Sequence, residues 1–301
     1  MGGVIFRYRC FGWFLLTVGA AGACESRAPV TRDAASVWAV DDAGDTVRLA
    51  APARRVVSLI PATSELLYAL GAGDRVVGRT TWCDYPPAIT TVPVMGDGIR
   101  PNIELVAAQR PDLVVLYNSG QNADAVARFR ELGIASVRVS IDRIDDLLRD
   151  ARLLGRLTGR DAAADSLARA ITDSLAAVTV DPGARRPAVF IIVWDSPPMT
   201  IGRGSFLHEL VERAGGRNIF GDLAASAGQV SIEAVADRNP DLILTSADGL
   251  PRFAGRPEWQ VVRAVRERHF LHVKGSAFDH PSPRTPGAIR ELSVRLAEAA
   301  P

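Results

Sequence analysis

Residues 102–114 read NIELVAAQRPDLV, and residues 231–243 read SIEAVADRNPDLI. The second phrase follows the first at a constant offset of 129 residues, without a gap. In each copy a residue that favours helix capping, Asn102 or Ser231, precedes a Glu in the first helical turn. A Pro-Asp pair then leads into an apolar strand. This recurrence indicates an internal duplication, which predicts two related lobes and not one sheet.

Short apolar runs alternate with helical patterns on both sides of the repeated phrase. Residues 55–60 read RVVSLI, which is typical of a buried parallel strand, and Thr63 or Ser64 is placed to cap the helix that follows. Further strands are expected at 76–78, 113–117 and 135–139 in the first lobe, and at 188–194, 242–244 and 271–273 in the second. Strands that alternate with helices predict an α/β fold with a parallel sheet in each lobe.

A helical stretch connects the two lobes. One helix is expected from Ile144 to Leu154, and a second over 161–178 would be about 27 Å long, enough to run along the side of both lobes. A hairpin of strands 37–40 and 46–49 precedes the first lobe. We therefore divide the chain into an N-terminal tether with this hairpin (24–53), an N-terminal lobe (54–158), a bridging helix (159–180) and a C-terminal lobe (181–301).

The N-terminus has the pattern of an export signal. Arg7 and Arg9 precede an apolar stretch at 10–20, and Ala21-Gly22-Ala23 then precedes Cys24. The stretch is shorter than the roughly 20 apolar residues that a membrane span needs. We expect residues 1–23 to be removed as a signal peptide and Cys24 to be lipidated. An ordinary signal peptidase cut after the same small residues stays open as the alternative.

Composition excludes several classes of protein. The chain has 301 residues, 35 Lys+Arg against 34 Asp+Glu, and 48% apolar residues, which is typical of a folded globular protein. Its formal charge of +1 and lack of a basic block argue against nucleic acid as a partner. Cys83 is the one cysteine of the body, and no Cys/His spacing indicates a metal site.

The sequence resembles the solute-binding proteins of ABC importers for cobalamin and ferric siderophores. The resemblance covers the chain from about Asp41 onward and rests on RVVSLIPATSEL at 55–66, CDYPP at 83–87, NIE at 102–104, RPDLV at 110–114 and AGGRNI at 214–219. It implies the class III architecture, in which two Rossmann-like lobes are joined by a single long bridging helix. It also implies a monomeric, non-enzymatic receptor that is periplasmic or lipid-anchored at the extracytoplasmic face of a membrane and serves a permease dimer. The CDYPP phrase favours the cobalamin branch.

The repeated glutamates gain a role from this resemblance. In the family, one surface Glu on each lobe docks into arginines of the permease, and Glu104 and Glu233 match these positions. Helix capping is the alternative role, because a carboxylate in the first turn stabilises a helix by about 0.3–1 kcal/mol. The two roles are compatible, since a first-turn Glu is both exposed and rigid.

The ligand is expected between the lobes, at the carboxyl ends of the strands. Aromatic walls suit the wide apolar rim of a corrin, although any one aromatic can equally pack in the core. Residues that end or follow the expected strands are the candidates for ligand contact: Pro61, Ala62, Thr63, Trp82, Tyr117, Trp194, Met199 and Phe278. Gly98, Ala227 and Ser276 stand where a cobalamin-binding relative carries ligand-facing side chains, so the choice of chelate stays open.

Two other functions are retained as alternatives. A ferric siderophore or haem would favour an arginine cluster in the cleft, with Arg100, Arg203 and Arg284 as candidates, and His280 could supply an axial imidazole. An exported enzyme acting on a tetrapyrrole is disfavoured, because no nucleophile–base–acid pattern is present. No cofactor is expected besides the cargo itself, a cobalt corrinoid or an iron chelate.

Overall fold

The computed structural model describes residues 36–178, 183 and 185–299. Its first sheet contains four parallel strands in the order β4-β3-β5-β6. These strands are β3 (Val56–Ser58), β4 (Val76–Arg79), β5 (Leu113–Tyr117) and β6 (Ala135–Val139). The sheet and the helices packed on it form the N-terminal lobe. All four strands lie where the sequence predicts them.

A second, separate sheet forms the C-terminal lobe. Its order is β10-β8-β7-β11-β12, with β9 also paired to β7. Strands β9, β7, β11 and β12 are parallel, whereas β8 and β10 extend the sheet in antiparallel pairing. The strands are β7 (Ala188–Asp195), β8 (Pro198–Ile201), β9 (Arg217–Asn218), β10 (Ala227–Gln229), β11 (Leu242–Thr245) and β12 (Phe270–His272).

The predicted duplication is confirmed by the topology. The parallel order β9-β7-β11-β12 repeats the order β4-β3-β5-β6 of the first sheet. The repeated phrase forms α2 (Ile103–Ala108) and α7 (Ile232–Arg238), and the side chains of Asn102 and Ser231 cap them by accepting hydrogen bonds from the backbone N–H groups of residues 105 and 234. After each helix the chain turns through a residue with positive φ, 47° at Arg110 and 43° at Asn239. The two copies therefore share their backbone path as well as their sequence.

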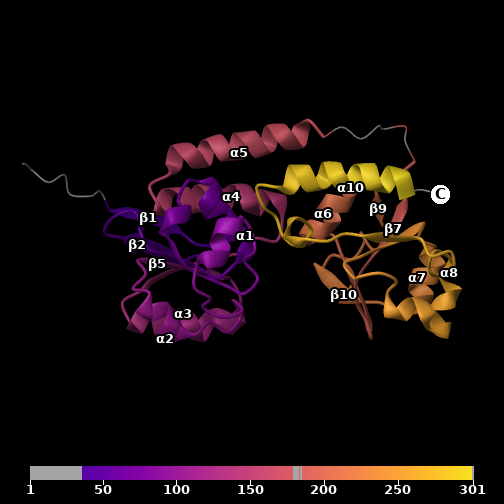
Figure 1. Cartoon of the computed structure of the whole chain (residues 1–301), viewed down its shortest axis with the longest axis horizontal. Helices are drawn as coiled ribbons and strands as arrows, with labels where there is room; N and C mark the ends of the chain where they lie inside the picture. Colours follow the sequence, from indigo (N-terminus) through magenta and orange to yellow (C-terminus); the bar gives the residue numbers. More distant parts are fainter. Residues whose placement is uncertain (1–35, 179–182, 184, 300–301) are drawn as a thin grey trace, which may run out of the picture. The chain divides into compact units, whose positions relative to one another are not determined.

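Helices cover both faces of each sheet, and Figure 1 shows α4, α5 and α10 on one side and α2, α3 and α7 on the other. Strand β5 shows why: Leu113 and Val115 pack in one apolar core, while Val114 and Leu116 pack in the core of the opposite face. Such runs are apolar throughout because both faces of a parallel sheet are buried. The helices are α1 (Pro61–Ala69), α3 (Ala123–Glu131), α4 (Ile144–Leu157), α5 (Asp161–Ala176), α6 (Phe206–Arg213), α8 (Arg263–Arg266), α9 (Ser276–Asp279) and α10 (Thr285–Ala299).

Short 3-10 helices occupy several connections, at Gly73–Arg75, Pro87–Thr91, Gly120–Asn122, Arg252–Gly255 and Pro257–Val261. The predicted hairpin is present as β1 (Val37–Val40) and β2 (Thr46–Leu49), and its inward side chains pack in the core of the N-terminal lobe. Among the described residues, none of the helices has the length and apolar character that a membrane crossing requires.

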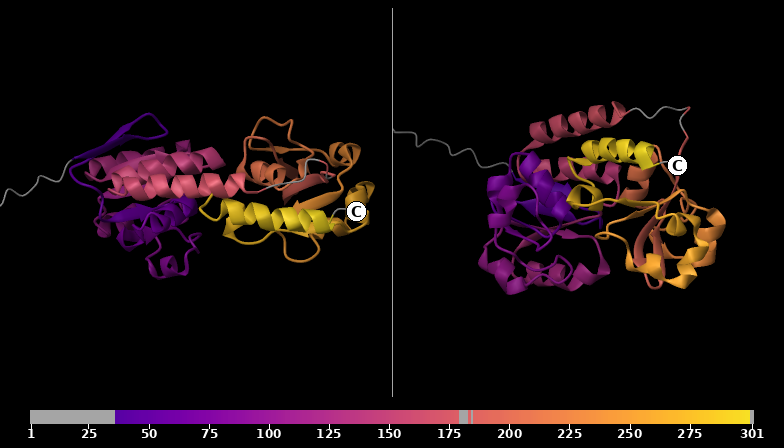
Figure 2. Two further views of the ribbon diagram at one scale, coloured as in Figure 1. Left: turned by 90° about the horizontal axis from the view of Figure 1, so that it is seen from above. Right: turned by 45° about the vertical axis from the view of Figure 1, so that its right-hand side comes forward.

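Helices α4 and α5 pack against one another, and both contribute to the core of the N-terminal lobe. Their ends also reach the C-terminal lobe, since Ile144 belongs to its core and Leu175 packs against the cores of both lobes. Figure 2 shows α5 and α10 side by side when seen from above. The α4–α5 pair therefore links the two cores through apolar contacts.

The expected cap of α1 is wrong. The helix begins at Pro61, and Ile60 precedes it without a side-chain cap. Proline suits this first position because its fixed φ is already helical and its missing N–H needs no partner there. The hydroxyls of Thr63 and Ser64 instead donate to the carbonyl oxygen of Ile60 inside the helix, and both also bond the hydroxyl of Ser58.

Candidate functional site

A pocket of about 410 Å³ lies where the carboxyl ends of both sheets meet. The first sheet contributes the segments that follow β3, β5 and β6, and the second contributes the ends of β7, β11 and β12 with the start of α6. Parallel α/β sheets place ligands at this edge. The lining residues are Ile60, Pro61, Ala62, Tyr117, Ile141, Asp142, Ile192, Val193, Ile201, Ser205, Phe206, Leu207, Ser226, Leu244, Ser246, Val273, Phe278, Asp279, His280 and Pro281.

The wall from the N-terminal lobe combines an apolar turn with one polar pair. Ile60, Pro61 and Ala62 form the turn that enters α1. Opposite them, the hydroxyl of Tyr117 donates to the carboxylate of Asp142, at 2.7 Å from either oxygen. Partial burial and this hydrogen bond raise the pKa of Tyr117. Tyr117 therefore stays protonated, and Asp142 keeps acceptor capacity for a ligand because a carboxylate offers about four lone pairs.

The wall from the C-terminal lobe is mainly apolar. Phe206 and Phe278 belong to the core of this lobe and close the pocket from that side. Asp279 and His280 add polar atoms beside Phe278. Burial raises the pKa of Asp279 and outweighs the lowering by His280 and Arg284, while the nearby Asp84 adds a smaller rise.

Neither lysine nor arginine lines this pocket in the described part of the chain. Arg284, one of three expected cationic contacts, pairs instead with the buried carboxylate of Glu65. Arg203 lines a different hollow, and Arg100 is exposed in the loop that begins α2. The arginine cluster that an anionic chelate would favour is therefore absent from this lining.

Four of the eight predicted ligand-contact residues line the pocket, namely Pro61, Ala62, Tyr117 and Phe278. Thr63 does not, and its prediction needs correction. Its side chain is fully buried, and its hydroxyl bonds Ser58 and the carbonyl oxygen of Ile60. No polar atom of Thr63 is left to face a ligand.

The three remaining candidates lie outside this pocket. Trp194 lines an adjoining pocket of about 360 Å³ that shares Ile192, Val193 and Ser246 with the first. Met199 pairs with Trp194 across β7 and β8. Trp82 is 66% exposed in the loop after β4 and lines neither pocket. A ligand that filled both pockets would reach Trp194 without moving the backbone.

Several lining residues escaped the sequence analysis. Asp142 lies just beyond β6, so the rule that ligands bind beyond strand ends could have found it. The start of α6, Ser205 to Leu207, could not be found this way, because it reaches the pocket after the unpredicted strand β8. Cys24 and its expected lipid lie outside the described residues.

The two repeated glutamates are both exposed, each at the second residue of its helix. Hydrogen bonds from its own backbone N–H and from Ser231 lower the pKa of Glu233. Helices α2 and α7 lie on the side opposite α5 and α10 (Figure 1). Both side chains are therefore presented to solvent from the same side of the sheets.

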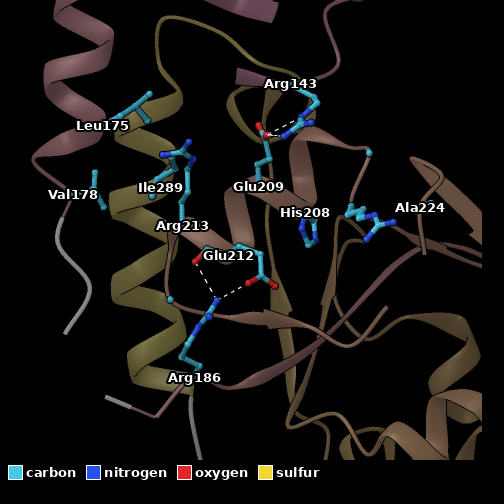
Figure 3. Close-up of a pocket in the computed structure, with 13 residues that line it drawn as sticks. Arg143, Leu175, Val178, Arg186, His208, Glu209, Glu212, Arg213, Ala224 and Ile289 are labelled. Atoms are coloured by element: carbon cyan, nitrogen blue, oxygen red, sulfur yellow. Dashed lines mark hydrogen bonds and ion pairs between the residues drawn. The ribbon is translucent and has the colours of Figure 1, made fainter. Parts of the chain in front are cut away.

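A larger hollow of about 1020 Å³ lies away from the strand ends, beside α6 and α10 (Figure 3). Its two acids are already engaged: Glu209 pairs with Arg143 at 2.5 Å, and Glu212 pairs with Arg186 at 2.6 Å. Among the described residues, no three His, Cys, Asp or Glu gather in a way that could hold a metal ion, here or elsewhere. The strand-end pocket is therefore the better candidate for a ligand site.

Comparison with known proteins agrees with this geometry. Residues 56–277 match the sequence profile described as periplasmic binding protein. The vitamin B12-binding protein of Salmonella paratyphi A is 34% identical over 250 residues, which cover 82% of this chain and 91% of that protein.

Two solved structures extend the comparison. The periplasmic vitamin B12-binding protein BtuF of Vibrio cholerae is 26% identical, with a TM-score of 0.63, and the match covers 82% of this chain and 98% of that one. The periplasmic heme-binding protein RhuT of Roseiflexus has a TM-score of 0.73 at 22% identity over 82% of this chain and 99% of that one, which is a likeness of fold. Since the profile covers both sheets and most of the lining of the strand-end pocket, the chain belongs to the periplasmic binding protein family.

Proposed function

We propose that this chain captures a corrinoid in the pocket between its lobes and delivers it to the permease of an ABC importer. Members of its family are extracytoplasmic components that bind small molecules for such transporters. The observation that carries the choice of ligand is the character of the pocket lining. It combines apolar and aromatic side chains with oxygen acceptors and, in the described residues, neither lysine nor arginine.

This lining suits a corrinoid better than an anionic chelate. A corrin has an apolar rim and amide arms whose N–H groups need acceptors, and Asp142, Asp279 and the serines of the wall supply them. Haem and most ferric siderophores carry carboxylates or other anionic groups, which would face Asp142 and Asp279 in this pocket without a lysine or arginine to compensate them. The adjoining pocket offers one arginine, Arg252. Relatives named for vitamin B12 binding support the same choice.

The adjoining pocket supports a ligand larger than the first pocket alone. Its volume of about 360 Å³ adjoins the 410 Å³ of the first through three shared residues. Single small-molecule sites measure roughly 300–1,000 Å³, so the two together suit one bulky ligand. Trp194 and Leu250, both more than half exposed, would then cover its outer part.

The purified protein is titrated with cyanocobalamin, a ferric tris-catecholate and haem, and binding is followed by calorimetry and by the visible spectrum of each ligand. We expect cyanocobalamin to bind at micromolar concentration or tighter, about 8 kcal/mol of binding free energy, and the two anionic chelates to bind far more weakly. Binding of haem or of the ferric catecholate in preference to cyanocobalamin would reject the corrinoid and leave the transport role. Absence of binding by all three would reject the proposal as a whole.

Glu104 and Glu233 are proposed to dock the loaded protein on the permease. Both are exposed, occupy equivalent positions in α2 and α7, and lie on the same side of their sheets. A partner built from two related subunits would meet them with two equivalent surfaces. Substituting both by Gln removes the charges and keeps the helices, since the caps at Asn102 and Ser231 remain.

Docking is tested by uptake of labelled cyanocobalamin into vesicles that contain the cognate permease. Glu104→Gln with Glu233→Gln should reduce uptake at least about tenfold, because each charge-assisted contact contributes roughly 1.5–3 kcal/mol, while ligand affinity stays unchanged. Glu298→Gln is the matched control, because Glu298 is exposed on α10, on the other side of the molecule. Full uptake by the double variant would refute the docking role.

Lipidation of Cys24 is proposed as the membrane anchor. The proposal rests on the sequence that precedes it, a short apolar stretch followed by Ala21-Gly22-Ala23. Mass spectrometry of the protein expressed in a bacterial host tests it. A diacylglyceryl mass on Cys24 is expected, and Cys24→Ser should release the protein from membranes. An unmodified N-terminus after Ala23 would instead indicate ordinary secretion.

A further inference from the structure

A buried glutamate in the N-terminal lobe bonds an arginine and a histidine from the C-terminal lobe. Glu65 in α1 is 3% exposed, and its carboxylate accepts from Arg284 at 2.8 and 2.5 Å and from Nε2 of His280 at 3.0 Å. The Arg284 guanidinium also stacks on the ring of Tyr85, 4.1 Å from its centre, and donates to Ser276. Burial would raise the pKa of Glu65, but these hydrogen bonds outweigh it and lower the pKa. We call Glu65, His280 and Arg284 the Glu65 clamp.

A second glutamate makes the reciprocal connection, from the C-terminal lobe to the N-terminal lobe. Glu209 in α6 accepts from Arg143 at 2.8 and 2.5 Å, and its other oxygen accepts from the backbone N–H of Ile144 at 2.9 Å. Figure 3 shows the two side chains pointing at one another. The carboxylate thus sits at the N-terminus of the 14-residue helix α4, where negative charge is favourable. Arg143, Ile144 and Glu209 form the Glu209 clamp.

The two clamps occupy equivalent places in the duplicated fold. Residues 61–71 read PATSELLYALG and residues 205–215 read SFLHELVERAG, which aligns Glu65 with Glu209 and Gly71 with Gly215. Each glutamate lies on the first long helix of its lobe, α1 or α6. Each lobe therefore offers one acid across the cleft and receives the acid of the other lobe.

Both clamps adjoin the pocket. Pro61 and Ala62 of the lining lie one turn before Glu65 in α1, and Phe206 and Leu207 lie on the same helix as Glu209. His280 lines the pocket itself while it bonds Glu65. The clamps thus bracket the pocket and join its two walls.

We infer that the two clamps fix the separation of the lobes, so that the pocket is preformed and its affinity depends on glutamates that do not touch the ligand. Separating the lobes would break the charge-assisted hydrogen bonds that the Glu65 carboxylate accepts from Arg284 and the bond from His280, which are largely withdrawn from water. It would also remove the carboxylate from the N-terminus of α4. Glu65 and Glu209 are therefore positioning residues, and the inference rests on the proposed function only where cyanocobalamin serves as the probe.

The test measures the distance between the lobes directly. Nitroxide labels are attached at Leu132→Cys in the N-terminal lobe and at Val261→Cys in the C-terminal lobe, two positions that are 47% and 58% exposed. Cys10→Ser and Cys24→Ser remove the two thiols that lie outside the described residues, and Cys83 is buried. Electron–electron double resonance then gives the distribution of label distances without a ligand.

The distribution is compared for the labelled chain, Glu65→Gln, Glu209→Gln and the double variant. Glu212→Gln is the matched control: it lies on α6 three residues after Glu209 and likewise accepts from one arginine and one backbone N–H, but both partners belong to its own lobe. We expect the distribution of label distances to widen about twofold in the double variant and to stay unchanged in the control. Only the double variant loses contacts between the lobes, so only there can one lobe move against the other.

The outcomes separate this inference from the proposed function. Unchanged distributions in all folded variants would overturn it. If Glu65→Gln does not fold, as judged by circular dichroism, Glu209→Gln decides alone. With cyanocobalamin as probe, the affinity of the double variant depends on the fraction of molecules whose lobes have the separation that binds the ligand. If this fraction falls to about one tenth, the double variant should bind about tenfold more weakly. Wider distances with unchanged affinity would also overturn it. If the unsubstituted chain does not bind cyanocobalamin, the proposed ligand is wrong and the distances still decide.

Discussion

Asp150 provides a quantitative test of the energetics of the N-terminal lobe. It lies on α4 and is fully buried, and its Oδ2 atom has no hydrogen-bond partner. Burial raises its pKa from 3.8 to about 8; the Arg149 guanidinium, 3.3 Å from Oδ1, opposes the rise, and the charges of Asp42 and Asp146 add to it. The folded protein therefore holds a proton on Asp150 at neutral pH. We predict that Asp150→Asn stabilises the protein.

The magnitude follows from the two pKa values of this one group. One pKa unit corresponds to 1.36 kcal/mol. Because pH 7 lies about three units above the pKa of this carboxyl in the unfolded chain, keeping it protonated in the folded state costs about 4 kcal/mol. Because the folded pKa is raised, the folded state binds more protons than the unfolded state between about pH 4 and pH 8. Stability contributed by this site is therefore lost as pH rises through that window. Asparagine does not titrate and removes the dependence.

Urea unfolding followed by circular dichroism between pH 4.5 and pH 8 measures the effect. The free energy of unfolding of Asp150→Asn should match that of the parent near pH 4 and exceed it by about 4 kcal/mol at pH 7. Asp145→Asn, on the exposed face of the same helix, is the control and should change stability by only a few tenths of a kcal/mol. Parallel curves for the parent and Asp150→Asn would refute the raised pKa, and so would a variant that is less stable at pH 7.

Other predictions concern the pocket and the loop before α6. Asp142→Asn should weaken cyanocobalamin binding about tenfold in calorimetry, because a hydrogen bond to a charged acceptor contributes about 1.5–3 kcal/mol. Tyr117→Phe removes the hydroxyl that donates to Asp142, so the carboxylate is free for the ligand and affinity should be equal or tighter. Equal affinities for the two variants would remove Asp142 from the site. Gly202→Ala should lower the free energy of unfolding by about 1–3 kcal/mol, since its Cβ would meet the carbonyl oxygens of two residues of the 223–225 turn. Gly287→Ala, with open space around it in α10, should instead raise that free energy by about 0.5–1 kcal/mol. A thermal melt that ranks these two glycine variants the other way would contradict this packing.

The fold could be predicted from sequence where local pattern and duplication agreed. The apolar runs at 55–60 and 113–117 became β3 and β5, because strands buried on both faces are apolar throughout. Strand β8 was missed, since Pro198 at its start and the glycines after it are typical of a turn. Its pairing with β7 and β10 depends on partners that are distant in sequence. The secondary-structure propensities of neighbouring residues do not predict such long-range pairings.

The site was predictable to the extent that strand ends are predictable. Tyr117 is the last residue of β5, Pro61 comes three residues after β3, and both line the pocket. Thr63 follows β3 as well, but the helix begins two residues earlier than its expected cap, so the side chain turns inward. Trp82 lies in a longer loop, and its place relative to the pocket depends on the path of that loop and not on the strand end.

The duplication accounts for both ends of the proposed mechanism. The equivalent helices α2 and α7 each present one exposed acid, as a two-fold partner requires. The equivalent helices α1 and α6 each present one acid across the cleft. The arginines that meet the second pair also hold equivalent places: Arg143 directly precedes α4, the helix after β6, and Arg284 directly precedes α10, the long helix after β12. The acids and the arginines of the two clamps therefore both follow the repeat. A receptor whose lobes are tied in this way would show the permease the same spacing of Glu104 and Glu233 with and without ligand, so the permease would have to sense cargo by some contact other than that spacing.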